Sequence, residues 1–537
     1  MNKLLLSLII SILILGNITF QTQGIQTTDL VRNSTIIVDN EGDGDFLNIK
    51  AALANANEGD IIQIYSGTYQ ENIKISTNNL SIIGYDHELG TGNDSNFPII
   101  DGNNNGNVIE IYAQNTAIKH CIIQNSGSDL FDAGISITTN TNRIEENGII
   151  GNHYGITLNN CSDNTIQSNY ILANTMDGIY LFYTWNNNII NNIIKENNFQ
   201  GIFIYDTSSS TIQGNTIFLN EKDGIHLRNY CKYNTICDNT IHSNNIDGIK
   251  IMESDIHDNK ITKNSIYSNG WNGLHVMDGN NNEISENEIS LNHFNGIHLG
   301  ETNNNLIIRN TIQDNKEEGI VILFPSAQGT KIYYNNIIND NVFDNGQNTW
   351  DNGKTTGGNY WSYYNGEDED NDGIGDTAYI IPGNGNIDRY PLINPQYPPD
   401  TPAKPSGATI GIIENYYTYK TSSSDTQFNS IQYGWDWNGD NQVDEWTDFY
   451  NPNQLCKITH VWNEEGTYNI KVKAMDNYGF QSNWSEPLSI SMPKQYDYNN
   501  GLFMRFLQSH FPILSNLITI IIHINQALMG YNLGKII

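Results

Sequence analysis

Four residues have acidic or basic side chains at a spacing that would suit proton transfer. Asp223 and His226 flank a Gly-Ile pair, and Asp247 and Lys250 repeat this arrangement one repeat unit later. On neighbouring strands the two pairs would lie about one strand spacing, ~4.8 Å, apart. With a cation held by the aspartates, Lys250 or His226 could remove the proton α to a uronate carboxyl group, giving β-elimination or epimerisation. On a neutral glycan, Asp223 and Asp247 could act as an acid and base pair.

Aromatic side chains near these four catalytic candidates could stack on sugar rings. They are Tyr180, Tyr183, Trp185, Phe203 and Tyr205. His275 and His298 occupy the position of His226 in later units, and such a pair could hold a transition metal. The simpler alternative is that all these polar residues are merely solvated on an outward face.

A first acidic segment has the ligand spacing of a calcium loop. Its carboxylates stand at relative positions 1, 3, 5 and 9, with Gly373 at position 6; the four acids are Asp368, Asp370, Asp372 and Asp376. Such spacing lets a turning loop bring several oxygen ligands to one hard cation. Position 12 holds Tyr379 in place of the Glu of an EF-hand loop. We predict a structural Ca²⁺ here, with a solvated acidic turn as the alternative.

A second segment repeats the 1, 3, 5, 9 pattern with Asp436, Asn438, Asp440 and Asp444. It departs further from the calcium-loop pattern, because Asn441 replaces the Gly and Thr447 replaces the Glu. We predict a second cation site at these four residues.

A repeat of about 23 residues must position these side chains. Its first half reads N-x-I-x-x-N-x-I-x-x-N, and its second half reads G-I-x-I/L, beginning at Gly134, Gly155, Gly178, Gly201, Gly224, Gly248, Gly273, Gly296 and Gly319. Period-2 pairs of β-branched residues between Gly and Asn clusters indicate short strands. A unit this short cannot bury its own apolar face, whereas a stack of units can. We therefore predict a parallel β-helix, right-handed because parallel crossovers are right-handed.

One Asn recurs in the middle of every unit, at Asn147, Asn169, Asn192, Asn215, Asn239, Asn264, Asn287, Asn310 and Asn335. Asn tolerates the left-handed backbone of a sharp turn, and its amide can bond to the Asn of the next rung. We expect both at this column. Low-complexity disorder is the alternative, and the aliphatic positions kept in register disfavour it.

The N-terminal region resembles the cap of a solenoid. Asp45–Leu53 favours one short amphipathic helix, and strands are expected within 59–69 and 80–84. A helix at this end would cover the open first rung.

Together with the closing segments Gly358-Asn-Tyr-Trp-Ser and Asp388-Arg-Tyr-Pro-Leu, these motifs make residues 34–395 resemble a known group. It is the NosD-like, carbohydrate-binding and sugar-hydrolysis (CASH) group of parallel β-helix proteins. The resemblance implies an all-β fold with a pectate-lyase-like solenoid, and its NosD members imply an association with copper. It implies no single activity, because the group includes lyases, epimerases, hydrolases and proteins without known activity.

A second domain is expected after a Pro-rich linker over 396–406. Strands expected at 408–413, 431–437, 467–474 and 488–491 make an immunoglobulin-like β-sandwich over 407–494. The segments Gly434-Trp-Asp-Trp-Asn-Gly-Asp and Gly466-Thr-Tyr-Asn-Ile-Lys-Val resemble PKD-like domains. That resemblance implies a spacer or adhesive module without catalysis.

The remaining boundaries follow from composition. Residues 1–24 have the basic start, apolar run and small residues of a secretory signal, with an uncleaved anchor as the alternative. The β-helix is expected over 30–345, and its C-terminal cap with the first acidic segment over 346–395. The apolar run of the tail, 495–537, is shorter than the ~20 residues that span a bilayer, so we expect docking on protein or membrane-surface association.

The charge balance excludes one class of partner. With 26 Lys and Arg against 59 Asp and Glu, the net charge of −33 opposes binding of nucleic acid through its phosphates. We expect a secreted or cell-surface, Ca²⁺-stabilised protein that binds polysaccharide, cell-surface glycan or surface partners. The alternative is a polysaccharide lyase, epimerase or hydrolase acting at the outward face. The sequence leaves enzyme status, the glycan and the oligomeric state open.

Overall fold

The computed structural model describes residues 34–90 and 96–493 of the 537-residue chain. The predicted signal segment and the predicted apolar tail lie outside the described residues. The chain divides into two compact units, which are described separately. Among the described residues, the first holds 34–90, 96–332, 337–349 and 380–387, and the second holds 333–336, 350–379 and 388–493. The domain boundaries drawn from the sequence remain predictions.

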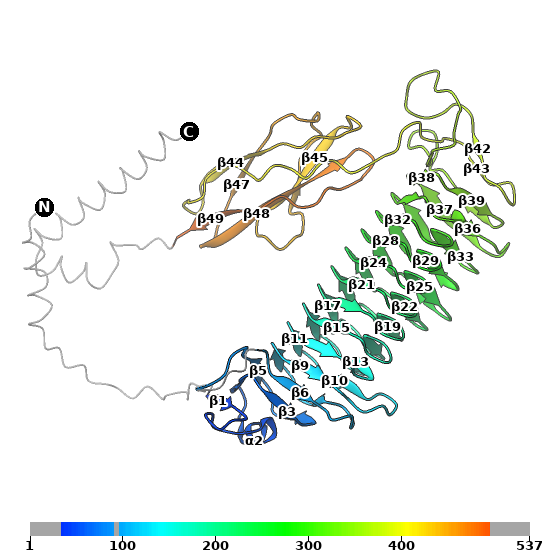
Figure 1. Cartoon of the computed structure of the whole chain (residues 1–537). Coiled ribbons are helices and arrows are strands. Elements are labelled where there is room, and N and C mark those ends of the chain that lie inside the picture. Colours follow the sequence, from blue (N-terminus) through cyan, green and yellow to red (C-terminus); the bar gives the residue numbers. More distant parts are fainter. Residues whose placement is uncertain (1–33, 91–95, 494–537) are drawn as a thin grey trace, which may run out of the picture. The chain divides into compact units, whose positions relative to one another are not determined.

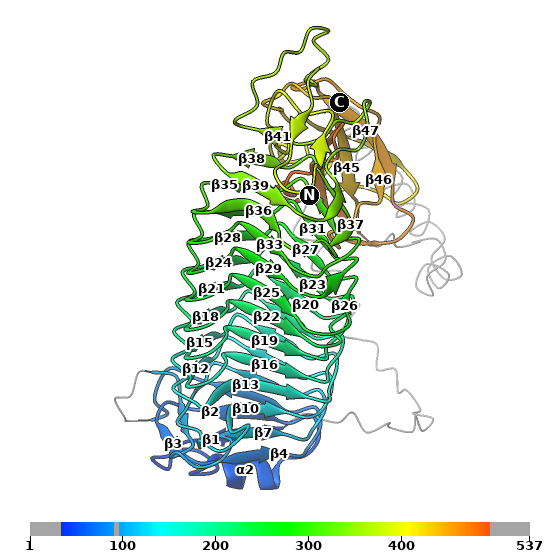
Figure 2. The same cartoon turned by 90° about the vertical axis from the view of Figure 1, so that its right-hand side faces the viewer.

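Three columns of parallel strands build the first unit, as Figures 1 and 2 show. The first column contains β1 (Thr35–Val38), β2 (Ile61–Ile64), β5 (Ser81–Gly84), β8 (Ala117–Lys119), β11 (Arg143–Glu145), β14 (Thr165–Gln167), β17 (Asn188–Ile190), β20 (Thr211–Gln213), β23 (Thr235–Cys237), β27 (Lys260–Thr262), β31 (Glu283–Ser285), β34 (Leu306–Ile308), β37 (Gln328–Tyr333) and β40 (Gln347–Thr349). The second contains β3 (Thr68–Gln70), β6 (Ile99–Asp101), β9 (Ile122–Gln124), β12 (Gly148–Ile150), β15 (Tyr170–Leu172), β18 (Ile193–Lys195), β21 (Thr216–Phe218), β24 (Thr240–His242), β28 (Ser265–Tyr267), β32 (Glu288–Ser290), β35 (Thr311–Gln313) and β38 (Asn336–Ile338).

The third column contains the G-I-x-I/L strands and carries the predicted catalytic residues. Its members are β4 (Ile73–Ile75), β7 (Ile109–Ile111), β10 (Ala133–Ile137), β13 (Tyr154–Asn159), β16 (Ile179–Phe182), β19 (Ile202–Tyr205), β22 (Ile225–Arg228), β25 (Ile249–Met252), β29 (Leu274–Val276), β33 (Ile297–Leu299), β36 (Glu318–Ile322) and β39 (Asn341–Asp344). A short pair, β26 (Ile256–His257) and β30 (Gly279–Asn280), adds to the stack. This is the parallel β-helix that the repeat predicts.

Rows of aliphatic side chains form the core of the stack. Ile212, Ile236 and Ile261 are register partners on successive rungs, and all three are fully buried. Each such side chain contributes about 1.5–3 kcal/mol by leaving water. No rung could bury its row alone, so the stack itself is the folding unit.

At the turns between strands, Asn side chains of successive rungs are joined by hydrogen bonds into ladders. Asn192 donates its backbone N–H and its side-chain amide to Oδ1 of Asn215, at 2.9 and 3.0 Å. Asn215 makes the same two bonds to Asn239, at 2.9 and 3.0 Å. These bonds confirm the predicted link between Asn residues of adjacent rungs.

The left-handed backbone lies one residue earlier than predicted. Asn191 and Asp238 have φ of 55° and 56°, whereas Asn192 and Asn239, which follow them, have no positive φ. The ladder Asn must align its N–H and its amide along the stack, so the residue before it makes the sharp turn. The prediction that the Asn column itself adopts this conformation is therefore wrong.

One helix caps the first rung, as predicted. Helix α2 (Ile49–Asn55) packs against β1, β2 and β4, and buries Ile49 and Ala52. Asn48 caps it by accepting the N–H of Ala51, and the Glu71 carboxylate accepts the N–H groups of Ile49 and Lys50. No helix in the described part of the chain is long and apolar enough to cross a lipid bilayer.

Antiparallel sheets form the C-terminal part of the second unit, visible as the yellow and orange strands of Figure 1. One sheet pairs β44 (Tyr416–Thr421) with β47 (Cys456–Val461), and the other has the order β46 (Glu445–Trp446), β45 (Ile431–Asp436), β48 (Gly466–Asp476), β49 (Leu488–Met492). Three short strands precede them: β41 (Tyr360–Trp361), β42 (Tyr379–Ile380) and β43 (Ile387–Asp388).

Three strands of the sandwich differ from the prediction. The strand expected at 408–413 does not form, apart from an isolated bridge between Ile410 and Ser491. β44 and β47 were not predicted, because their polar, Thr- and Lys-containing sequences lack a clear apolar alternation. Tyr433 and Trp435 of β45 are fully buried in the core between the two sheets.

Candidate active site

Three Asn ladders of the described stack contain Asn187, Asn192 and Asn197. The two predicted catalytic carboxylates belong to a fourth ladder, at the residue before each repeat Gly. Oδ1 of Asp223 accepts the N–H of Asp247 at 3.1 Å. Oδ1 of Asp247 accepts the N–H and the side-chain amide of Asn272, at 3.0 and 2.9 Å. Asp223 is 2% exposed and Asp247 is fully buried. One oxygen of each carboxylate is therefore committed to the ladder, and neither carboxylate is open to a substrate.

The second oxygens of the same carboxylates hold outward-facing bases. Nδ1 of His226 lies 3.2 Å from Oδ2 of Asp223. Nδ1 of His275 lies 3.0 Å from Oδ2 of Asp247, and Nζ of Lys250 lies 3.7 Å from that oxygen. The four predicted catalytic residues thus come together as two adjacent rungs.

His275 joins this site, although the sequence suggested it only as a metal ligand. The register of β22, β25 and β29 places His226, Lys250 and His275 directly opposite one another. The signal for this role was present in the sequence, because His275 occupies the same repeat position as His226.

The free nitrogen of His226 faces away from its carboxylate. Its Nε2 is buried and has no hydrogen-bond partner among the described residues. The ring lies edge-on to Phe203, with centroids 5.2 Å apart. Its Nδ1 lies 3.2 Å from Oδ2 of Asp223 and 3.4 Å from the side-chain amide nitrogen of Gln200.

Burial and neighbouring charges shift the pKa values of the ionisable side chains on this face in different directions. Burial alone would raise the pKa of Asp247, but the hydrogen bond and charge of His275, the Asn272 N–H and the charge of Lys250 hold it below its ordinary value. Burial, with the negative charge of Asp223, raises the pKa of Asp177 to about 7. Burial, with the charge of His275, lowers the pKa of His298 to about 4. Asp247 therefore stays ionised beside its two basic partners.

The five predicted sugar-stacking residues fall into two groups. Tyr180 stacks on Tyr154 and on Phe203, with centroids 5.6 and 5.3 Å apart, so these rings mainly cover each other. Tyr205 is half-buried beside Tyr183. Tyr183 and Trp185 are 45% and 46% exposed, which leaves these two open to a ligand.

An exposed aromatic pair lies nearer the basic residues in sequence and was missed. Trp271 immediately precedes Asn272 of the fourth ladder, and Phe294 occupies the same position in the next unit. Their ring centroids are 6.3 Å apart, and both rings are exposed. Their repeat position, two residues before Gly, was the available signal.

The first acidic segment forms a compact loop in the second unit. Ligand oxygens of Asp368, Asp370 and Asp372 lie within 4.8 Å of one another, and Gly373 takes a φ of 86° in the turn. An exposed Asp triad that could bind a metal is thus present. Asp376 is not part of this triad; its Oδ2 accepts the N–H of Glu369 at 2.8 Å.

The second acidic segment uses its side chains to fold its own turn. Asp436 is fully buried and accepts the N–H groups of Asn438, Gly439 and Asn441. Asp444 accepts the N–H of Trp437 at 2.7 Å. Asn438 and Asp440 likewise bond within the turn. The cation site predicted here stays a prediction.

The transition-metal alternative lacks a third ligand. The rings of His275 and His298 stack with centroids 4.7 Å apart. Within the described ranges, the Asp368 triad is the only place where three His, Cys, Asp or Glu ligand atoms gather within 4.8 Å. His275 and His298 therefore do not fit a copper site by themselves.

An open cleft of about 480 Å³ lies elsewhere on the stack. Its lining consists of Asn280, Asn303, Asn304, Gln328, Gly329 and Gln347. None of the predicted site residues lines it.

Comparison with known families agrees with the observed architecture. A family model described as a right-handed β-helix region matches residues 133–267. This part of the chain therefore matches a right-handed β-helix, in agreement with the handedness predicted from the repeat. A second model, described as periplasmic copper-binding protein (NosD), matches residues 229–366 of this β-helix protein. No curated protein matches its sequence.

Solved structures resemble each part of this β-helix protein. The PKD domain of an M14-like peptidase from a Thermoplasmatales archaeon is 32% identical, over 18% of this chain and 99% of that domain, with a TM-score of 0.17. The C-terminal antiparallel sheets thus resemble a PKD domain. The AlgE6 A-module, a mannuronan C-5 epimerase from Azotobacter vinelandii, is 14% identical over 56% of this chain and 91% of its own, with a TM-score of 0.44. DFA-IIIase from Arthrobacter chlorophenolicus is 13% identical over 56% of this chain and 91% of its own, with a TM-score of 0.38. The last two likenesses concern the fold alone.

Proposed function

We propose that the outward face of β22, β25 and β29 binds an acidic polysaccharide outside the cytoplasm. The observation that carries the proposal is the row His226, Lys250, His275, which the buried Asp223 and Asp247 hold in place. Lys250 carries a positive charge on this face, in a chain whose net charge of −33 otherwise repels polyanions. The export signal predicted at residues 1–24 and the periplasmic name of the matched family support the location.

The position of Lys250 fits carboxylate recognition. Its Nζ lies 3.7 Å from Asp247, beyond normal hydrogen-bond length, so its donors are free for a ligand. The exposed rings of Trp271 and Phe294 on the same stack offer apolar surface for sugar rings. A uronate polymer presents both chemistries, because each sugar has a carboxylate on an apolar ring face.

Affinity measurements with polygalacturonate, alginate and neutral dextran test the proposal. We expect the two acidic polymers to bind, dextran to bind weakly, and Lys250→Ala to weaken acidic binding at least tenfold. Lys195→Ala is the matched control, because the two lysine side chains are 20% and 18% exposed and Lys195 lies on the second column. Equal losses in the two variants, or equal binding of dextran, would reject the proposal.

Proton abstraction is a second candidate function, which the carboxylate–histidine pairs favour. Nδ1 of His226 lies beside the Asp223 carboxylate, and a movement that exposes the buried Nε2 would let this nitrogen take the proton α to a uronate carboxyl group. The electron pair would form a carbon–carbon double bond and expel the glycosidic oxygen, which Lys250 would protonate. Hydrolysis by Asp223 and Asp247 has less support, because both carboxylates are buried and bonded to the ladder.

Absorbance of unsaturated sugar products tests this lyase function. We expect activity on a uronate polymer to fall at least a hundredfold in His226→Gln. Asp223→Asn keeps the ladder acceptor for Asp247 and removes the partner of His226, so a similar loss is expected. Full activity in both variants would exclude this site.

We also propose that the triad of Asp368, Asp370 and Asp372 binds Ca²⁺ as a structural ion. The convergent carboxylate oxygens and the absence of nitrogen or sulfur ligands in the triad support a hard cation.

A further inference from the structure

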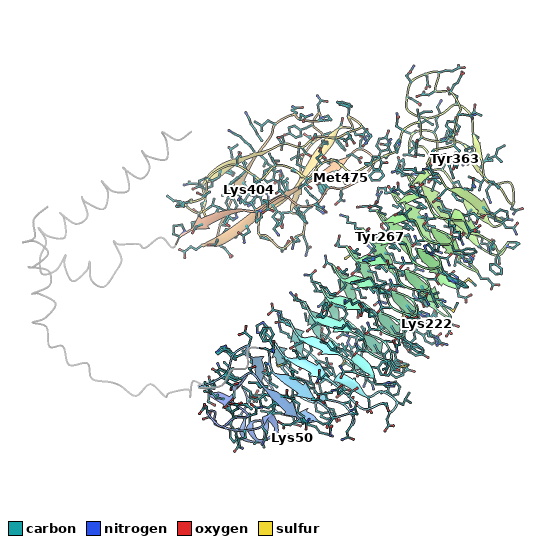
Figure 3. All side chains as sticks on the ribbon, in the orientation of Figure 1. Lys50, Lys222, Tyr267, Tyr363, Lys404 and Met475 are labelled. Atoms are coloured by element: carbon teal, nitrogen blue, oxygen red, sulfur yellow. The ribbon has the colours of Figure 1, made fainter. Side chains whose placement is uncertain are left out.

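The open cleft of about 480 Å³ lies on the first unit and shares no residue with the row His226, Lys250, His275. Figure 3 labels Tyr267 of β28, from which the chain continues through β29 to the first residue of the cleft. Apart from Gly329, every lining residue carries a side-chain amide. These residues are Asn280, Asn303, Asn304, Gln328 and Gln347.

Hydrogen bonds and strand register place four of these amides in a row along the stack. Oδ1 of Asn280 accepts the N–H and the side-chain amide of Asn303, at 2.8 and 3.3 Å. Oδ1 of Asn303 accepts the N–H of Gln328 at 3.3 Å. Gln328 is the register partner of Gln347 on the next rung. The row therefore extends over three strand spacings of ~4.8 Å, about 14 Å in all.

Three of the amides are available to a ligand. The side chains of Asn304, Gln328 and Gln347 are exposed, and within the described ranges none of them makes a hydrogen bond to the protein. Each offers two N–H donors and one acceptor oxygen. Gly329 keeps the space beside them open: its φ is 73°, and a Cβ there would collide with Oδ1 of Asn304.

The chemistry of the lining selects a neutral, polar ligand. The cleft has no ionisable side chain, in a chain with 26 Lys and Arg and 59 Asp and Glu, so a charged ligand would gain no counter-charge there. Its volume lies within the ~300–1,000 Å³ of small-molecule sites, but those sites are mostly apolar. An apolar ligand would therefore gain little from this lining.

The main chain around the cleft leaves no edge for a peptide strand. The N–H of Asn304 donates to the carbonyl of Gln328 at 3.0 Å, and the N–H of Gln347 donates to the carbonyl of Ala327 at 3.1 Å. Strand addition needs free main-chain groups, and other peptide sites use apolar grooves. A glycan needs neither, because it bonds through hydroxyl and amide groups.

We propose that the cleft binds an N-acetylated glycan, whose neutral sugar rings carry acetamido groups. An acetamido group is itself an amide, so it can pair with a side-chain amide as Asn303 pairs with Asn280. The remaining amides can bond to the sugar hydroxyls. Because the row of amides is longer than one sugar ring, we expect an oligosaccharide to bind better than a single sugar.

Calorimetric titration of the full chain with tetra-N-acetylchitotetraose tests the proposal. Cellotetraose is the matched ligand, because it has the same linkage and a hydroxyl in place of each acetamido group. We expect the acetylated sugar to bind and cellotetraose to bind at least tenfold more weakly. Equal affinities, or no binding of the acetylated sugar, would overturn the proposal. Tetra-alanine binding as tight as that of the acetylated sugar would also overturn it and would indicate a peptide site.

Variants of the cleft locate the bound sugar. Gln328→Ala with Gln347→Ala removes two exposed amides and should weaken binding of the acetylated sugar at least tenfold. Gln213→Ala is the control, because Gln213 is an exposed glutamine of the first column outside the cleft. Lys250→Ala, on the face proposed for acidic polysaccharide, should also keep the full affinity. Unchanged affinity in the double variant, or an equal loss in Lys250→Ala, would overturn the proposal.

Discussion

Asp223 and Asp247 differ from the Asn residues of the same ladder by one terminal atom in each side chain. Asn272 uses its amide nitrogen to bond back to Asp247, at 2.9 Å. The corresponding oxygens of Asp223 and Asp247 instead hold His226 and His275. The ladder thus explains why the position is polar, and the choice of Asp explains why two bases are fixed beside it.

Asp177 tests the energetic consequence of an acid at a ladder position. Its pKa of about 7 exceeds the ordinary value of 3.8, so the fold favours the protonated form. Its contribution to stability is complete below about pH 4 and is lost as the pH rises through 7. Asp177→Asn keeps the acceptor for the Gln200 N–H and should stabilise the protein by about 1–3 kcal/mol at pH 8, with little change at pH 4.

Urea unfolding at pH 4, 6 and 8 measures this effect. The exposed Asp278→Asn serves as the control and should show the same pH dependence as the unaltered protein. A stability difference for Asp177→Asn that does not grow with pH would contradict the assigned protonation.

At the scale of elements, the Asn ladders determine how rungs stack. Asn215 is fully buried and joins the rungs on both sides through its N–H, its Oδ1 and its amide. Its amide also donates to the carbonyl of Ile189 at 2.8 Å. Ser210 occupies the equivalent place in another ladder, where its hydroxyl accepts only the N–H of Asn187 from the preceding rung.

The two positions give a matched comparison. Asn215→Ala should destabilise the protein by about 2–4 kcal/mol, because it leaves several buried groups unpaired. Ser210→Ala should cost about 1 kcal/mol, because the Asn187 N–H loses its acceptor and the Ser208 carbonyl loses the hydroxyl donor. Denaturant unfolding followed by circular dichroism measures both. Equal losses would show that side-chain volume, and not the ladder bonds, governs the corners.

The sequence predicted these elements unevenly. The strands of the third column follow from the Gly-Ile repeat, since the same interval recurs with aliphatic residues in register. In the sandwich, β44 escaped prediction, because a strand identified by a single unrepeated alternation has little local signal. The left-handed turn residues lie one position before the ladder Asn, and residue types as different as Asn191, Leu219 and Asp238 adopt this conformation there.

For the whole molecule, cation binding is the property most open to measurement. The Asp368 triad is exposed at two of its three residues, so the ion would exchange freely with solvent. A ligand present at 100 times its Kd stabilises a fold by about 2.7 kcal/mol. Calcium should therefore raise the melting temperature of the full chain above its value in chelator.

Substitution of the triad should reduce this rise. Asp368→Asn with Asp372→Asn removes two ligands, whereas Asp376→Asn alters an acid outside the triad and should keep the full response. Differential scanning calorimetry with Ca²⁺ and with chelator makes the comparison. If calcium raised the melting temperature equally in the unaltered chain, the double variant and Asp376→Asn, the stabilising ion would bind away from the triad.

The sequence by itself determined the repeat, its strand period, the rung to which each polar residue belongs and the two acidic segments. These properties are local, because they depend on residue type and on a regular interval. Only the tertiary structure decided that Asp223 and Asp247 are buried and that His275 shares the site with Lys250. Burial and partnership depend on neighbours distant in the chain, and the same Asp can be a solvated acid, a ladder member or a cation ligand according to those neighbours.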